Sequence, residues 1–141
     1  MIVEILLFIF FWFTMCGLWH ETMHLLECER QHIPSSYMWL VFRPLPGLHY
    51  TYVGYSDNPG LIRLAGGLYT SIVCFILSIF FISIYWFLSW VFLTLGWTQL
   101  VYGWFEYRYI LSMSVKKYFM CRYTIYITCI ILHLLLLKVV I

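Results

Sequence analysis

The sequence from Ile2 to Leu26 reads IVEILLFIFFWFTMCGLWHETMHLL, an apolar run that becomes polar only near its end. At a rise of about 1.5 Å per residue, a helix of this length crosses the hydrocarbon core of a bilayer, about 30 Å thick. The run therefore predicts a membrane-spanning helix over residues 2–26. We expect it to remain in the protein, because Glu4 stands where a signal peptide carries basic residues.

The composition extends this prediction to the whole chain. Of its 141 residues, 64% are hydrophobic, 22% are aromatic and only 10% are charged, which is far outside the range of soluble domains. Further apolar stretches predict spanning helices at about residues 61–83, 88–111 and 123–141. We therefore expect one all-α integral membrane domain over residues 1–141 with about four transmembrane helices. The net charge of +2 and the absence of a basic run exclude a nucleic-acid partner.

The segment 27–60 is the most polar in the chain and contains all four prolines. Two β-rich runs at 37–42 and 49–53, separated by Pro44-Leu45-Pro46-Gly47, predict a short β-hairpin at the membrane face. Basic residues flank this loop and the segment 112–122, whereas the loop between the second and third helices has none. The positive-inside rule then places both basic loops in the cytoplasm and both termini outside.

The end of the first helix carries His20-Glu21-Thr22-Met23-His24, an HExxH motif. Histidines four residues apart share one helix face, so both imidazoles can bind one Zn²⁺ while Glu21 acts as a general base. Packing alone is the alternative reading of such a histidine pair. Titratable groups at membrane depth are costly and usually functional, which favours a zinc site.

A catalytic zinc site commonly has three protein ligands and one water, so a third ligand must come from elsewhere. Glu106 lies about six residues before the cytoplasmic end of the third helix, which is the depth of His20 in the first. Gln99, Tyr102 and Gly103 precede Glu106 at helical spacing, making one polar or small face. We expect this face to point toward the first helix.

Two alternatives concern these carboxylates. Asp57 is the rival third ligand, although Asp57-Asn58-Pro59-Gly60 also forms an ordinary turn sequence. Glu106 could instead pair with Arg108 or Arg63 at the membrane interface.

The second helix opens with Ala65-Gly66-Gly67. Paired glycines let another backbone approach closely, so we predict that Gly66 and Gly67 contact an extended substrate, together with Gln99 and Tyr102. Helix packing explains the two glycines equally well.

The order of these features resembles the site-2 protease family of intramembrane zinc metalloproteases. The resemblance covers roughly residues 18–71, with HETMH as its strong motif and Ala65-Gly66-Gly67 as a weak echo of the family's small-residue motif. It implies that His20 and His24 are zinc ligands and that Glu21 activates water. The family's third ligand is an aspartate in a Pro-Asp-Gly motif on a later helix, and no such motif follows Gly60 here, so either Glu106 substitutes or the site is altered.

The sequence therefore predicts a zinc metalloendopeptidase that hydrolyses membrane-embedded polypeptides. One alternative is a non-catalytic subunit of a larger membrane complex, with a structural metal or a relic HExxH site docked against partner subunits. Another is a di-iron oxidase, because His20 and His24 also fit HxxxH spacing, although the chain has no second histidine box. Metal identity separates the three: one zinc, no metal, or two irons per chain.

Overall fold

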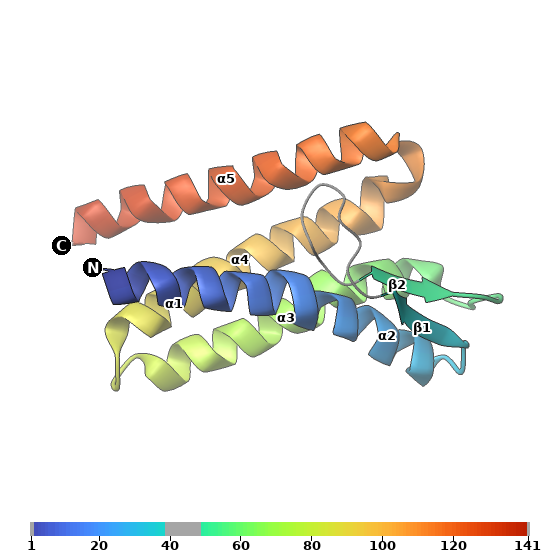
Figure 1. Ribbon diagram of the computed structural model, residues 1–141, viewed down its shortest axis with the longest axis horizontal. Coiled ribbons are helices and arrows are strands. Elements are labelled where there is room, and N and C mark those ends of the chain that lie inside the picture. Colours follow the sequence, from blue (N-terminus) through green and yellow to red (C-terminus); the bar gives the residue numbers. More distant parts are fainter. Residues whose placement is uncertain (1, 39–48, 141) are drawn as a thin grey trace.

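The computed structural model describes residues 2–38 and 49–140, which are largely helical. In chain order the elements are α1 (Ile2–Phe13), η1 (Thr14–Trp19), α2 (His20–Arg30), β1 (Ser35–Met38), β2 (His49–Tyr52), α3 (Pro59–Phe81), α4 (Trp86–Tyr109), η2 (Ile110–Ser112) and α5 (Val115–Val140). Both ends of the chain and the turn between α3 and α4 lie at one end of the molecule. The strands and the connection between α4 and α5 lie at the other (Figure 1).

The first helix is continuous through α1, η1 and α2, and it ends at Arg30, four residues beyond the predicted boundary. Its middle part, η1, is π-helical, and the backbone N–H of His20 donates to the carbonyl of Met15. A π-helical turn holds more residues than an α-helical turn, so η1 rotates the side chains of α2 about the helix axis relative to those of α1. The rotated segment begins with the HExxH motif.

Three helical segments are long and apolar enough to cross a membrane: Ile2–Arg30, Pro59–Phe81 and Lys116–Leu135. The described residues thus offer three candidate spans, one fewer than the four predicted. Helix α4 falls short because it carries a set of buried polar side chains, namely Ser89, Thr94, Thr98, Gln99 and Glu106. These side chains lower its hydropathy while facing the protein interior.

Helices α3 and α4 form the centre of the fold, and their backbones touch. A Cβ added to Gly67 would lie 2.3 Å from the Cα of Gly103. Toward the other end of the pair, Ser78 donates a hydrogen bond of 2.8 Å to the carbonyl of Ser89. Small residues at such a crossing are typical of helices packed within membranes, because lipid supplies no hydrophobic force between them.

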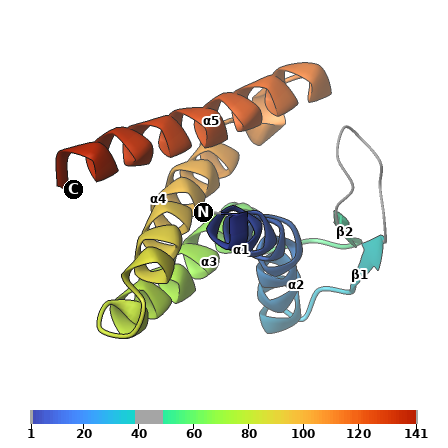
Figure 2. The same ribbon diagram turned by 60° about the vertical axis from the view of Figure 1, so that its left-hand side comes forward.

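Helix α5 begins at Val115, earlier than the predicted boundary near residue 123. The segment expected to be a basic loop, residues 112–122, is helical from Val115 onward, so Lys116 and Lys117 lie in the first turn. Ser114 precedes this turn, and its side chain and carbonyl accept from the backbone N–H groups of Lys117 (3.4 Å) and Tyr118 (2.9 Å). A serine at this position starts a helix, and basic residues do not stop one. Figure 2 shows α5 diverging from the other helices toward the C-terminus.

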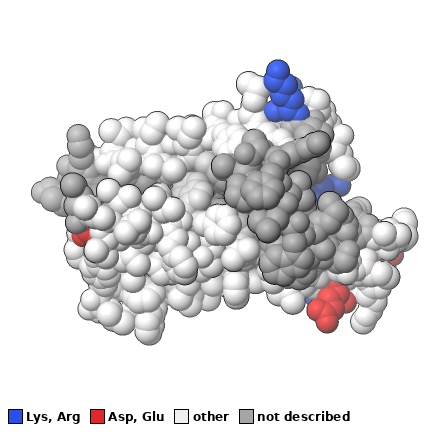
Figure 3. Space-filling view, viewed as in Figure 1, with Lys and Arg blue, Asp and Glu red and all other residues white. Residues whose placement is uncertain are grey.

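The polar segment between α2 and α3 contains β1 and β2, which pair antiparallel with Ser35 opposite Tyr52 and Met38 opposite His49. Most of the predicted first strand and the predicted turn at 44–47 lie outside the described residues. On the face in Figure 3, nearly all visible charged side chains gather at the end that holds these strands and the α4–α5 connection. The rest of that face is almost uncharged, as a lipid-facing surface requires.

Candidate metal centre

Three side chains that could hold a metal ion meet in the interior, and they come from two helices. His20 and His24 come from α2 and Glu106 from α4, and their candidate ligand atoms lie within 4.8 Å of one another. The three residues are 0%, 2% and 5% exposed. Glu106 is thus level with the histidines, as its depth in the sequence predicted.

The atoms of this cluster form a nearly regular triangle. His20 Nε2 is 3.1 Å from Glu106 Oε2 and 3.1 Å from His24 Nε2, and His24 Nε2 is 3.6 Å from Glu106 Oε2. Zinc binds nitrogen and oxygen at about 2.0–2.1 Å in a tetrahedron, so neighbouring ligand atoms lie about 3.3 Å apart. The triangle therefore has the size of one face of a zinc coordination tetrahedron.

The other ring nitrogens fix which atoms point into the triangle. His24 Nδ1 lies 2.6 Å from the carbonyl oxygen of Ile62, and His20 Nδ1 lies 2.7 Å from Gln99 Oε1. Both oxygens accept, so each Nδ1 carries the hydrogen and each neutral Nε2 presents a lone pair to the triangle. Two lone pairs and a carboxylate oxygen that face one another repel unless a metal ion or a shared proton lies between them.

Glu106 is held from its other oxygen. Its Oε1 accepts hydrogen bonds from Tyr102 on α4 (2.7 Å) and from Tyr118 on α5 (2.6 Å). Nothing in the sequence pattern singled out Tyr118, because it fell inside the predicted basic loop. With the observed start of α5, Tyr118, Arg122 and Tyr126 share one helix face, and this spacing is the signal that could have found it.

Gly66 forms part of the wall of the centre. A Cβ added to Gly66 would lie 2.3 Å from His24 Nε2 and 2.7 Å from His20 Nε2. The absence of a side chain on α3 at this point therefore makes room for both imidazoles. Gly67 instead contacts Gly103 of α4 at the helix crossing. The space beside Gly66, predicted to admit substrate, is thus filled by the two imidazoles, and the space beside Gly67 is filled by the backbone of α4.

The remaining predicted site residues occupy different surroundings. Glu21 is 7% exposed and close enough to His24 to interact with it electrostatically. Asp57 is exposed in the segment before α3 and is not in the cluster. Gln99 and Tyr102, predicted to contact substrate, are fully buried and hydrogen-bonded to His20 and Glu106.

The contacts of Glu106 also answer one alternative. Within the described part of the chain, the Glu106 carboxylate lies against His20 and His24 rather than against Arg108 or Arg63. Arg108 is exposed near the end of α4. The interfacial ion pair considered from the sequence is therefore not what holds this carboxylate.

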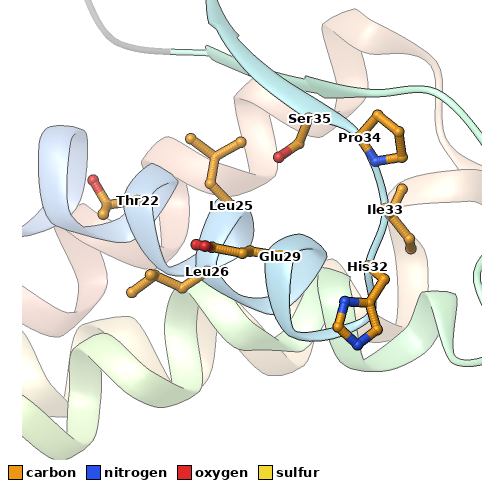
Figure 4. Close-up of a pocket in the computed structure, with 8 residues that line it drawn as sticks. All are labelled: Thr22, Leu25, Leu26, Glu29, His32, Ile33, Pro34 and Ser35. Carbon is orange, nitrogen blue, oxygen red and sulfur yellow. The ribbon is translucent and has the colours of Figure 1, made fainter.

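A pocket of about 630 Å³ lies beside α2, away from the metal-binding cluster. Thr22, Leu25, Leu26 and Glu29 line it from α2, and the following segment His32-Ile33-Pro34-Ser35 lines its other side (Figure 4). None of the three cluster residues lines this pocket. At 100° per residue, Thr22, Leu26 and Glu29 lie on the opposite side of the helix from the two histidines.

Comparisons of the chain with protein-family models, with curated proteins and with solved structures found no match.

Proposed function

We propose that this protein is an intramembrane zinc hydrolase, similar to the site-2 proteases, that cleaves peptide bonds of membrane-embedded polypeptides. The observation that carries the proposal is the triangle of His20 Nε2, His24 Nε2 and Glu106 Oε2, all three of which present acceptor atoms to one point. Two histidines and one glutamate form a zinc-ligand set that is used in catalysis. These residues would hold the ion.

A zinc ion bound there supplies Lewis-acid chemistry, because it makes a water molecule more acidic and polarises a carbonyl group. Glu21 would accept the proton from that water, since it follows His20 directly and is close enough to His24 to interact with it electrostatically. Gln99 and the carbonyl of Ile62 keep the two imidazoles in the orientation that the ion requires. In this proposal Glu21 transfers the proton, whereas Gln99 and the carbonyl of Ile62 orient the ligands.

The membrane arrangement forms part of the proposal. Helix α4 packs along α3, and we propose that it crosses the bilayer with it, which would give four spans. The charged end with the strands would face the cytoplasm and both termini would lie outside. A substrate helix hides its carbonyls in hydrogen bonds, so it would unwind near this end and pair as a strand with the β1–β2 sheet.

Replacing Glu21 with glutamine tests the catalytic assignment. Glu21→Gln removes the proton acceptor and leaves His20, His24 and Glu106 in place, so cleavage should disappear while bound zinc stays. Both proteins would be incubated in liposomes with single-span membrane polypeptides, and new N-termini counted by mass spectrometry. His20→Ala serves as the metal-free control. Cleavage retained by Glu21→Gln would exclude the proposed base.

A second function is favoured by the closure of the centre. All three ligand residues are 5% exposed or less, and Oε1 of Glu106, the oxygen that faces away from the histidines, accepts hydrogen bonds from two tyrosines. Structural zinc sites are closed, whereas catalytic sites keep a position open. A non-catalytic membrane subunit with a structural metal would bind zinc in the same assay and produce no new N-termini. Two irons per chain would instead indicate the oxidase.

A further inference from the structure

Helix α5 is attached to the rest of the protein through a narrow stripe. Tyr126 is its one buried side chain among those that the structure describes, and the exposed face includes Met120, Ile127 and Ile131. Tyr118, Arg122 and Tyr126 follow one another at four-residue spacing and so lie on one face of the helix. The divergence of α5 in Figure 2 agrees with this limited contact.

The stripe meets the metal centre at Tyr102 and Glu106. The guanidinium of Arg122 lies 5.0 Å from the centre of the Tyr102 ring and 5.5 Å from that of Tyr126. Tyr118 Oη donates to Glu106 Oε1 over 2.6 Å and is also in contact with the hydroxyl of Tyr102. The first turns of α5 are therefore joined to a metal ligand by a direct hydrogen bond.

These hydrogen bonds divide the two oxygens of Glu106 between different tasks. Oε1 receives the hydroxyl hydrogens of Tyr102 and Tyr118, while Oε2 faces the two histidines. A carboxylate with one oxygen occupied by two donors has only the other oxygen left to give to an ion. Without the donors, both oxygens could turn toward the ion and take up an additional coordination position.

We propose that Tyr118 is a positioning residue through which α5 holds Glu106 as a one-oxygen metal ligand, so that docking of α5 and metal binding strengthen each other. The inference rests on the metal centre of the proposed function, and it adds a residue and a helix that the HExxH motif does not include. The coupling is reciprocal: if docking of α5 increases metal affinity by some factor, then bound metal increases the docking equilibrium of α5 by the same factor. Hydrogen-bonding partners of metal ligands commonly contribute 10- to 100-fold in affinity.

Cobalt(II) is the probe for this proposal, since its visible absorption reports both binding and the number of ligands. Detergent-purified wild-type protein, Tyr118→Phe and Tyr123→Phe would be titrated with Co²⁺. Tyr118→Phe removes one oxygen and keeps the ring that stacks near Phe105, with centroids 6.0 Å apart. Tyr123→Phe is the matched control, because it makes the same change on the same helix outside the Glu106 hydrogen bonds. Hydrogen exchange at the first turns of α5 would be followed with and without Co²⁺.

We expect Tyr118→Phe to bind Co²⁺ at least about tenfold more weakly and to show a weaker visible absorption typical of a higher coordination number. Added Co²⁺ should slow exchange in α5 of the wild type and of Tyr123→Phe, but much less in Tyr118→Phe. If Tyr118→Phe does not fold, hydrogen exchange of the wild type decides, because exchange in α5 that Co²⁺ leaves unchanged would overturn the coupling. Wild-type affinity, spectrum and exchange in Tyr118→Phe would overturn the inference and leave the metal centre standing. A folded wild type that binds no Co²⁺ would overturn both.

Discussion

Gly66 offers the sharpest test of the site geometry, because alanine there adds a single carbon against two metal ligands. The added Cβ would lie 2.3 Å from His24 Nε2, 2.6 Å from His24 Cε1 and 2.7 Å from His20 Nε2. Ordinary contact needs about 3.5 Å, so the His24 ring must move by about 1 Å. His24 Nδ1 is hydrogen-bonded to the carbonyl oxygen of Ile62, which is on the same helix as Gly66, so this movement strains the hydrogen bond as well.

The expected loss of zinc affinity comes from this strain. Metal sites tolerate ligand shifts of about 0.2 Å, and overpacking a well-packed interior costs about 1–3 kcal/mol. Because each 1.4 kcal/mol is a factor of ten, Gly66→Ala should bind zinc roughly 10- to 100-fold more weakly than the wild type. Competition with a chromophoric chelator in detergent measures this affinity.

Gly17→Ala is the matched control, because a Cβ at Gly17 would meet no atom within 4 Å beyond its chain neighbours and the nearby backbone of its own helix. It lies three residues before His20 in the same continuous helix. This variant should bind zinc as the wild type does, and both variants should keep the wild-type helical content by circular dichroism. A Gly66→Ala protein that binds zinc within about twofold of Gly17→Ala would refute the contact between α3 and the imidazoles.

Three other substitutions test contacts around the centre. Gly67→Ala should lower the melting temperature, because its Cβ would meet the backbone of Gly103 at 2.3 Å and force α3 and α4 apart; an unchanged melting curve would contradict this crossing. Asp57→Asn should leave zinc affinity unchanged in the chelator assay, since Asp57 is exposed outside the cluster, and a loss would restore it as the rival ligand. Glu27→Ala should also lower the melting temperature, by an amount that reflects about 1–3 kcal/mol, because it deprives Arg30 and Tyr69 of an acceptor that is 1% exposed.

The position of Glu106 could be predicted because it depends only on distances along the sequence. Its depth below the end of a helix and its helical spacing from Gln99 and Tyr102 are both read directly from the sequence. In the structure that face contacts His20: Gln99 Oε1 lies 2.7 Å from His20 Nδ1, and Glu106 Oε2 lies 3.1 Å from His20 Nε2. A polar face on an otherwise apolar helix packs against other polar groups, because burying it against apolar surface is costly.

The parts that were missed depend on three-dimensional packing or on a helix boundary. Gly66 was predicted to admit a peptide, and only the packing of α2 on α3 shows that it admits two imidazoles. Tyr118 was missed because the apolar pattern places the start of the last helix at residue 123, whereas α5 begins at Val115, eight residues earlier, directly after Ser114. The π-helical η1 has no marker in the sequence that we recognised, yet it immediately precedes His20.

The most direct test of the metal centre is the metal content of detergent-purified protein by mass spectrometry, with His20→Ala and Glu106→Ala beside the wild type. The triangle of ligand atoms predicts about one zinc per chain in the wild type and none in either variant. A well-folded wild type without metal, or zinc retained by Glu106→Ala, would contradict the His20–His24–Glu106 site.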